Sequence, residues 1–283
     1  MMKIVKRVMA GIALLLAMLA LAAVLAPTPK GVLVLEYHEV ADSVPSDEWA
    51  YNVPPEDFRE QLAYLRAEGY ETISMLDYAK AKKGKLMLPQ KPVVLTFDDG
   101  YENNYTTLLP ILEEYGMKGT VYMITNRIGR EGYLTWNQLR DMQARGMEIG
   151  SHTANHIPLT TLSREQQRDE LRLSKLMLEW KGMKTIYSFS YPNGAYDDGV
   201  VAMLQEEEYL TAVTGEAGLN SLDTNPYRLH RVNIAPPRLG LMEFRLRLMK
   251  ADIAARLNVR LAQLPDGVRE RIDSLRALLR NDL

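Results

Sequence analysis

The sequence predicts an α/β fold in which seven or eight parallel strands alternate with helices, favouring a β/α barrel over an open doubly wound sheet. Amphipathic helical stretches that end at a glycine are followed repeatedly by short apolar runs rich in β-formers. Such alternation implies right-handed crossovers between parallel strands. The chain has 283 residues, 47% of them hydrophobic and 25% charged, which is an ordinary globular composition.

The glycines mark where each helix is expected to stop, because a left-handed C-cap favours glycine. The expected helices span 54–69, 104–115, 136–145, 163–181 and 197–208. The expected strands span 32–35, 70–75, 93–97, 119–125, 147–150, 185–189, 210–213 and 228–234. A Leu- and Arg-rich helical extension follows Pro237 and is interrupted near Pro265.

The N-terminus carries an export signal. Lys3, Lys6 and Arg7 precede an uncharged run from Val8 to Ala26, which is long enough as a helix to cross a bilayer. The positive charges predict that this end stays in the cytoplasm and that the rest is extracytoplasmic, either anchored or secreted after cleavage. We favour the anchor, because the small-residue cleavage site at 24–26 is only partial. The expected organisation is a signal or membrane anchor over 1–30, a catalytic domain over 31–245 and a helical extension over 246–283. The basic face of the extension is expected either to be solvated or to contact anionic lipid.

Composition excludes several kinds of function. The chain has no cysteine, which excludes disulfide frameworks, thiolate nucleophiles and cysteine metal ligands. Its 34 basic residues are balanced by 36 acidic ones, so it lacks the basic surface that nucleic-acid binding requires. Any metal must therefore be held by His, Asp or Glu.

Polar residues follow four of the expected strands, at the end where parallel β/α folds place their functional side chains. These segments are Tyr37-His38, Asp98-Asp99-Gly100, the stretch 151–156 that contains His152 and His156, and Tyr191-Pro192-Asn193-Gly194. Three of the four histidines are thus expected on one rim, and the fourth, His230, within the last strand.

The histidine pair and the aspartate pair together indicate a metal site. His152 and His156 are four residues apart, so in a helical turn their rings would share one face. Two imidazoles and one carboxylate with open positions describe a hydrolytic zinc site or a non-haem iron site. Adjacent aspartates on a strand point in opposite directions, so Asp99 and Asp98 could divide metal binding and proton transfer between them. Without the histidines, the Asp-Asp-Gly sequence would be equally typical of a turn that caps the next helix.

Two motifs together resemble those of a known family: Thr96-Phe97-Asp98-Asp99-Gly100 and the segment 151–156. The family is the polysaccharide deacetylases, which are also called carbohydrate esterase family 4 or the NodB homology domain. The resemblance runs from about Gly31 to Phe244. The resemblance implies a distorted (β/α)7 barrel that removes acetyl groups from N-acetylated sugars with a divalent metal. It implies that Asp98 is the general base and that Asp99, His152 and His156 bind zinc, or else cobalt, nickel or ferrous iron.

The position of the catalytic acid distinguishes branches of this family. Leu35-Glu36-Tyr37-His38 at the start of the domain resembles the circularly permuted branch that includes the biofilm poly-N-acetylglucosamine deacetylases, which makes His38 the acid; His230 is the alternative. Tyr191-Pro192-Asn193 resembles the motif whose backbone N–H binds the oxyanion. The arginine that commonly precedes this motif's proline is absent, and Arg231 either replaces it or forms a structural salt bridge.

The predicted function is metal-dependent de-N-acetylation of an extracytoplasmic polysaccharide that contains N-acetylglucosamine. Two alternatives remain open: a non-catalytic carbohydrate-binding protein on the same scaffold, and a metal-dependent amidase that acts on a small amide. The expected partners are an N-acetylated glycan and the membrane. The sequence specifies neither the glycan nor the oligomeric state.

Overall fold

The computed structural model describes residues 31–43, 49–234, 236 and 238–262. Within it, Gly31–Leu248 form one compact unit, which carries all the elements of the candidate site, and the described residues from Met249 onward belong to a second unit. The expected anchor at 1–30 lies outside the described residues, and so do residues 263–283 of the expected extension.

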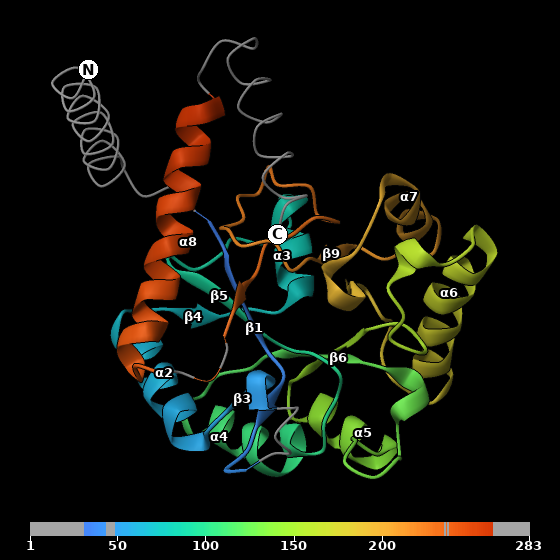
Figure 1. Cartoon of the computed structure of the whole chain (residues 1–283), viewed down its shortest axis with the longest axis horizontal. Coiled ribbons are helices and arrows are strands. Elements are labelled where there is room, and N and C mark those ends of the chain that lie inside the picture. Colours follow the sequence, from blue (N-terminus) through green and yellow to red (C-terminus); the bar gives the residue numbers. More distant parts are fainter. Residues whose placement is uncertain (1–30, 44–48, 235, 237, 263–283) are drawn as a thin grey trace, which may run out of the picture. The chain divides into compact units, whose positions relative to one another are not determined.

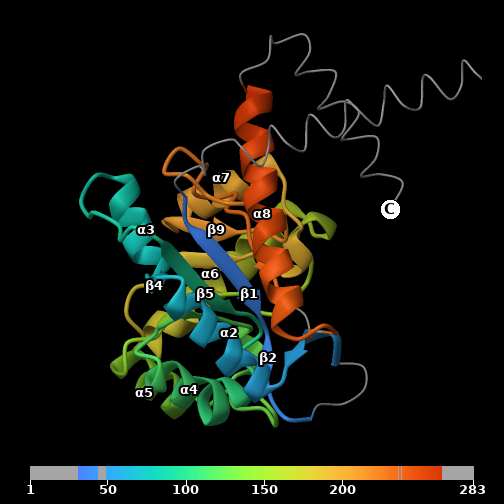
Figure 2. The ribbon, with the colours of Figure 1, turned by 90° about the vertical axis from the view of Figure 1, so that its left-hand side faces the viewer.

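Parallel strands form one curled sheet at the centre of this unit (Figures 1 and 2). The spatial order is β10-β1-β5-β6-β7-β8-β9, and β4 pairs with the start of β5. These strands are β1 (Leu33–Tyr37), β4 (Glu71–Thr72), β5 (Pro92–Phe97), β6 (Thr120–Met123), β7 (Glu148–Ser151), β8 (Ser188–Ser190), β9 (Thr211–Val213) and β10 (Val232–Asn233). A separate parallel pair joins β2 (Glu39–Val40) to β3 (Asn52–Val53).

The two edges of the sheet approach each other. Val213 of β9 forms a parallel bridge with Leu229, three residues before β10 begins, and β10 pairs with β1. Val34, Val94 and Tyr122, from β1, β5 and β6, share one buried cluster with Val213 and Leu229. Strands from both ends of the order therefore enclose a common apolar interior, as in a distorted β/α barrel.

Helices connect successive strands, and most begin where the sequence supplies a cap. Ser74, Thr135 and Ser163 each form a reciprocal capping box with the residue three positions on. The helices are α2 (Pro55–Ala67), α3 (Met75–Lys82), α4 (Leu109–Glu114), α5 (Trp136–Ala144), α6 (Arg164–Trp180), α7 (Asp198–Glu206) and α8 (Leu241–Ala262), together with a π-helix (Asn104–Leu108) and short 3-10 turns at 49–51, 125–127, 159–161 and 192–194.

Three expectations were wrong in detail. The strand expected at 70–75 is only Glu71–Thr72, because Ser74 caps α3 and Met75 is already helical. The last strand is only Val232–Asn233, so His230 precedes it instead of lying within it. His152 and His156 lie on an irregular loop instead of a helical turn, because Thr153 and His156 have φ values of 67° and 61°.

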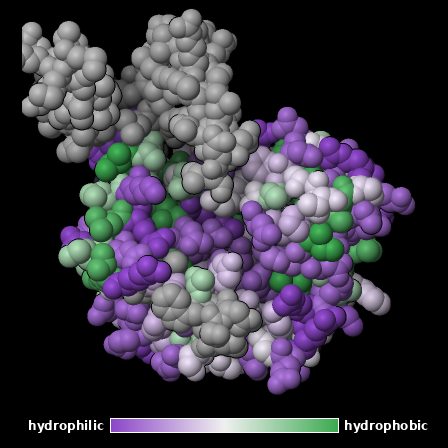
Figure 3. All heavy atoms as spheres, viewed as in Figure 1, coloured by the Kyte–Doolittle hydropathy of each residue, from purple (hydrophilic) through white to green (hydrophobic). Residues whose placement is uncertain are grey.

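No helix among the described residues is long and apolar enough to cross a membrane. The apolar run at 8–26 falls outside them. On the face shown in Figure 3, hydrophobic residues gather on the side where α8 begins, and Leu239, Met242 and Leu246 are exposed there.

Candidate active site

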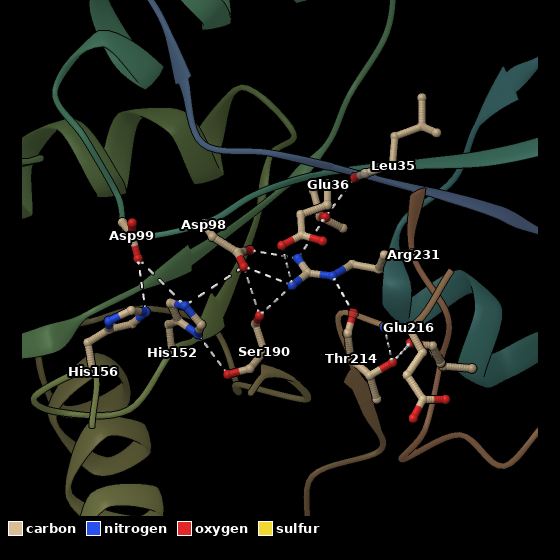
Figure 4. A network of polar contacts seen from close by, with 12 residues as sticks. Leu35, Glu36, Asp98, Asp99, His152, His156, Ser190, Thr214, Glu216 and Arg231 are labelled. Atoms are coloured by element: carbon tan, nitrogen blue, oxygen red, sulfur yellow. Dashed lines mark hydrogen bonds and ion pairs between the residues drawn. The ribbon is translucent and has the colours of Figure 1, made fainter. Parts of the chain in front are cut away.

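Two aspartates leave the end of β5 in different directions. Asp98 is buried and faces Arg231, whereas Asp99 faces the two histidines (Figure 4). The backbone turns sharply here, because Asp99 and Gly100 both have positive φ, 72° and 80°. A Cβ on Gly100 would lie 2.3 Å from Sδ of Met123, so any larger residue would also have to displace the end of the Met123 side chain.

Both histidines lie on the loop that follows β7. Nδ1 of His152 is 2.7 Å from the carbonyl oxygen of Ser190. Because a carbonyl only accepts, Nδ1 donates the proton and Nε2 keeps its lone pair for a metal. The ring of His156 packs beside it, with the ring centroids 4.7 Å apart.

Asp99, His152 and His156 bring three ligand atoms together. Oδ1 of Asp99 lies 3.6 Å from Nε2 of His152 and 3.5 Å from Nε2 of His156. This oxygen is buried and accepts no hydrogen bond from the described residues. An orphaned carboxylate oxygen that faces two imidazole nitrogens is a donor set that fits a divalent cation of the zinc type.

Arg231 is the largest fully buried side chain among the described residues. Its Nη1 and Nη2 each donate to one oxygen of Asp98, both at 2.9 Å, and Nε donates to the carbonyl of Thr214 at 2.9 Å. Nη2 also lies 3.1 Å from Oε1 of Glu36. This bidentate geometry fixes both the position and the orientation of the Asp98 carboxylate.

The charges around Asp98 favour its carboxylate form. Burial alone raises the pKa of Asp98, but the charge of Arg231, with a smaller contribution from His152, outweighs burial and holds that pKa well below its usual value. Burial and the neighbouring His152 lower the pKa of His156. A lowered pKa favours the neutral imidazole, which is the form that binds a metal.

A cavity of about 770 Å³ joins these groups. His38, which follows β1, also lines it, and a nitrogen of His38 lies within 4.8 Å of an Asp98 oxygen. The exposed Asn193 lines it too, on a turn where its φ is 55°. The cavity lining also includes Glu36, Tyr51, Asp98, Asp99, Tyr101, His152, His156, Tyr191 and Arg231.

The remaining candidates differ in where they lie. The buried Tyr191 borders the cavity, and its hydroxyl donates to the carbonyl of Tyr227 at 2.9 Å. Pro192 is buried and starts the turn that presents Asn193. His230 is not part of the cavity lining; its Nδ1 lies 3.8 Å from Oε2 of Glu216.

Sequence reasoning missed two residues that contact the site. Ser190 donates from Oγ to Oδ2 of Asp98 at 3.0 Å, and its carbonyl accepts from His152. Glu36 pairs with Arg231. Glu36 lies at the C-terminal end of β1, next to Tyr37-His38, and Ser190 lies at the C-terminal end of β8, next to Tyr191-Pro192. This position beside a motif was the signal that the sequence offered.

The chain is similar in sequence to known proteins. Residues 85–212 match the family described as Polysaccharide deacetylase. A Bacillus subtilis (strain 168) protein named "Putative polysaccharide deacetylase YxkH" is 34% identical over 218 residues, which cover 75% of this chain and 74% of that protein. A poly-beta-1,6-N-acetyl-D-glucosamine N-deacetylase of Staphylococcus epidermidis is 24% identical over 72% of this chain and 78% of its own length.

Solved structures share the fold. The Streptococcus pyogenes deacetylase PplD, determined in complex with acetate, has a TM-score of 0.71 and 28% identity, with 79% of this chain and 99% of PplD covered. IcaB from Ammonifex degensii has a TM-score of 0.66 and 25% identity over 73% of this chain and 93% of its own.

Proposed function

This chain belongs to the polysaccharide deacetylase family, hydrolases of N-acetyl amide bonds, and we propose that it deacetylates a polysaccharide that contains N-acetylglucosamine, using a divalent cation. One observation carries this proposal: Asp99, His152 and His156 converge on the same cavity as the Asp98–Arg231 pair. A metal-binding face and a positioned base are the two components that hydrolysis of an amide requires.

Asp99, His152 and His156 would hold the cation, with zinc the first candidate. When bound, it would polarise the acetyl carbonyl and lower the pKa of a water. The chain contributes the orientation of the ligands. The carbonyl of Ser190 fixes the tautomer of His152, and Oδ1 of Asp99 accepts no competing hydrogen bond from the described residues.

Asp98 takes the proton of the attacking water. Arg231 and Ser190 orient its carboxylate, and the charge of Arg231 keeps it ionised at neutral pH, so it is ready to accept. Its Oδ2 lies 3.7 Å from Nε2 of His152, which places the base beside the proposed metal site. General-base catalysis of this kind contributes about 100- to 10,000-fold in rate.

His38 completes the reaction as the general acid. The oxygen of the water bonds to the acetyl carbon, and the backbone N–H of Asn193 donates to the oxyanion that forms. The carbon–nitrogen bond then breaks as protonated His38 donates to the nitrogen, giving acetate and a free amine on the sugar. Asn104 supports His38 by donating from Nδ2 to its backbone carbonyl at 2.9 Å.

Two relatives support the substrate class. The Staphylococcus epidermidis protein described above is named for poly-β-1,6-N-acetyl-D-glucosamine. A peptidoglycan-N-acetylglucosamine deacetylase of Bacillus cereus is 33% identical over 44% of this chain. The extracytoplasmic location rests on the basic and apolar N-terminus at 3–26. Both polymers lie outside the cytoplasm, so the two proposals agree with each other.

Acetate release from poly-N-acetylglucosamine, peptidoglycan and chitin oligomers tests the proposal, with the full-length chain assayed in mild detergent. We expect release from at least one polymer, its loss with chelator and its recovery with zinc or cobalt. Release that persists after complete metal removal, or none from any of the three, contradicts the proposal.

A further inference from the structure

Glu170 is a buried carboxylate outside the catalytic cavity, and its side chain accepts hydrogen bonds from the loop that bears the two histidines. It lies on α6 and is 8% exposed. Its Oε2 accepts from the backbone N–H groups of Ala154 and Asn155, both at 2.9 Å, and its Oε1 accepts from Nδ2 of Asn155 at 2.5 Å. Ala154 and Asn155 lie between His152 and His156 in the sequence.

The loop needs such support, because its backbone is unfavourable by itself. Thr153 and His156 both have positive φ, at 67° and 61°, which costs free energy for residues with a side chain. Such conformations persist only where surrounding contacts determine them. The hydrogen bond from the backbone N–H of His156 to Oγ1 of Thr153, at 2.9 Å, lies within the loop and cannot anchor it to the barrel.

Two sides of the barrel anchor the loop instead. From the turn after β6, the backbone N–H groups of Thr125 and Asn126 donate to the carbonyls of Thr153 and Ala154, and Nδ2 of Asn126 donates to Oδ1 of Asn155 at 2.7 Å. From α6, Glu170 accepts three hydrogen bonds. Glu170 supplies the charged acceptor in this set, and charge-assisted bonds are about twice as strong as neutral ones.

The helix is itself fixed, so Glu170 is a firm support. Ser163 caps α6, and Gln167 donates from Nε2 to the carbonyls of Leu159 and Leu162. One turn beyond Glu170, Oγ of Ser174 and Oγ of Ser151 are 2.7 Å apart, which ties α6 to the end of β7.

We propose that Glu170 is a positioning residue that sets the separation of His152 and His156 and thereby the affinity of the site for a divalent cation. It reaches the ligands only through Ala154 and Asn155, which lie between them, and touches no reacting atom. This inference rests on the metal-dependent function proposed above.

Titration of metal-free full-length protein with Co²⁺ alone tests the proposal, followed by its visible absorption and by competition with a chelator. Glu170→Ala should weaken Co²⁺ binding about 10- to 100-fold and alter the absorption spectrum, since supports of ligands typically have effects of this size. Glu170→Gln, whose amide oxygen can still accept from both backbone N–H groups, should recover most of the affinity. Asp169→Ala removes the same charge from the adjacent, exposed position on α6 and should leave binding unchanged.

The outcomes separate the two proposals. If the wild-type chain binds no Co²⁺, the metal-dependent function fails. If the wild type binds and Glu170→Ala binds with the same affinity and spectrum, only the role of Glu170 fails, even when the variant has a lower melting temperature. Should Glu170→Ala not fold, Glu170→Asp keeps the charge but is one methylene too short to reach both backbone groups. We expect it to bind Co²⁺ about 10-fold more weakly, and wild-type affinity in this variant overturns the proposal.

Discussion

Arg231 holds Asp98 through two parallel hydrogen bonds, a geometry that lysine cannot reproduce. Arg231→Lys keeps the charge but leaves Asp98 free to rotate about the remaining contact with Ser190. We expect the rate of acetate release to fall about 100-fold, because small displacements of a catalytic group have effects of this size. Steady-state kinetics on a soluble oligosaccharide should show the loss in kcat more than in KM.

Arg228→Lys is the matched control for this substitution. Arg228 is on the same segment, is partly exposed, pairs with Asp198 and does not line the cavity. Its replacement should leave kcat unchanged and shift the free energy of unfolding by less than about 0.5 kcal/mol. Equal kcat in wild type and Arg231→Lys would show that Arg231 is only a structural ion pair.

Asp98 can be separated from the metal ligands by an isosteric change. Asp98→Asn keeps the size of the side chain but cannot take a proton, so acetate release should fall by about 100- to 10,000-fold. Co²⁺ should still bind, because Asp99, His152 and His156 are intact. His152→Ala, in contrast, should lose both activity and metal. Activity of the purified Asp98→Asn variant close to wild type would refute the assignment of the base.

The main site residues could be predicted from the sequence because each follows an expected strand. In a parallel sheet, the C-terminal ends of the strands lie on the same rim. The sequence could not show which of these residues touch. Arg231 lies far along the chain from Asp98, so only the path of the last segment beside β1 reveals their pairing. Glu36 and Ser190 were missed because a single Glu or Ser has no motif of its own.

At the scale of elements, the turn after β5 depends on a glycine for two independent reasons. Gly100→Ala must place a side chain at a φ of 80° and must also displace Met123. Gly69, which ends α2 at a φ of 78°, has open space where a Cβ would be. We expect urea unfolding to show a loss of about 1 kcal/mol for Gly69→Ala and at least about 2 kcal/mol for Gly100→Ala. Equal losses would mean that packing against Met123 contributes nothing.

The five expected helices were predicted more closely than the strands, whereas α3 was not predicted, although Ser74 supplies it with the same kind of capping box. Ser163 and Thr135 supply capping boxes that a sequence displays directly, and α6 and α5 begin immediately after them. A strand has no such local mark, since its ends depend on its neighbours. In the segment 228–234, which was expected to be one strand, only Val232 and Asn233 pair with β1.

At the scale of the whole molecule, the N-terminal run at 8–26 should determine where the enzyme acts. We expect the full-length chain to sediment with membranes, to resist an alkaline carbonate wash and to be digested by protease added to spheroplasts. Leu15→Arg together with Leu19→Arg should move it to the soluble fraction, since each arginine at the centre of a span costs about 3 kcal/mol. A wild-type chain that is already soluble in the cytoplasm would contradict the proposed location.

Metal binding should also stabilise the fold as a whole. Asp99 follows β5 and the two histidines follow β7, so one cation would link segments that β6 separates in the sheet. Because the unfolded chain does not hold these three ligands together, a free concentration of 100 times the Kd should raise the free energy of unfolding by about 2.7 kcal/mol. Urea denaturation at fixed zinc concentrations measures this, and the midpoint should rise with the logarithm of zinc above the Kd. His156→Ala, which loses one ligand, should show little of the rise. A wild-type midpoint that is independent of zinc would mean that the three side chains do not act together as a site.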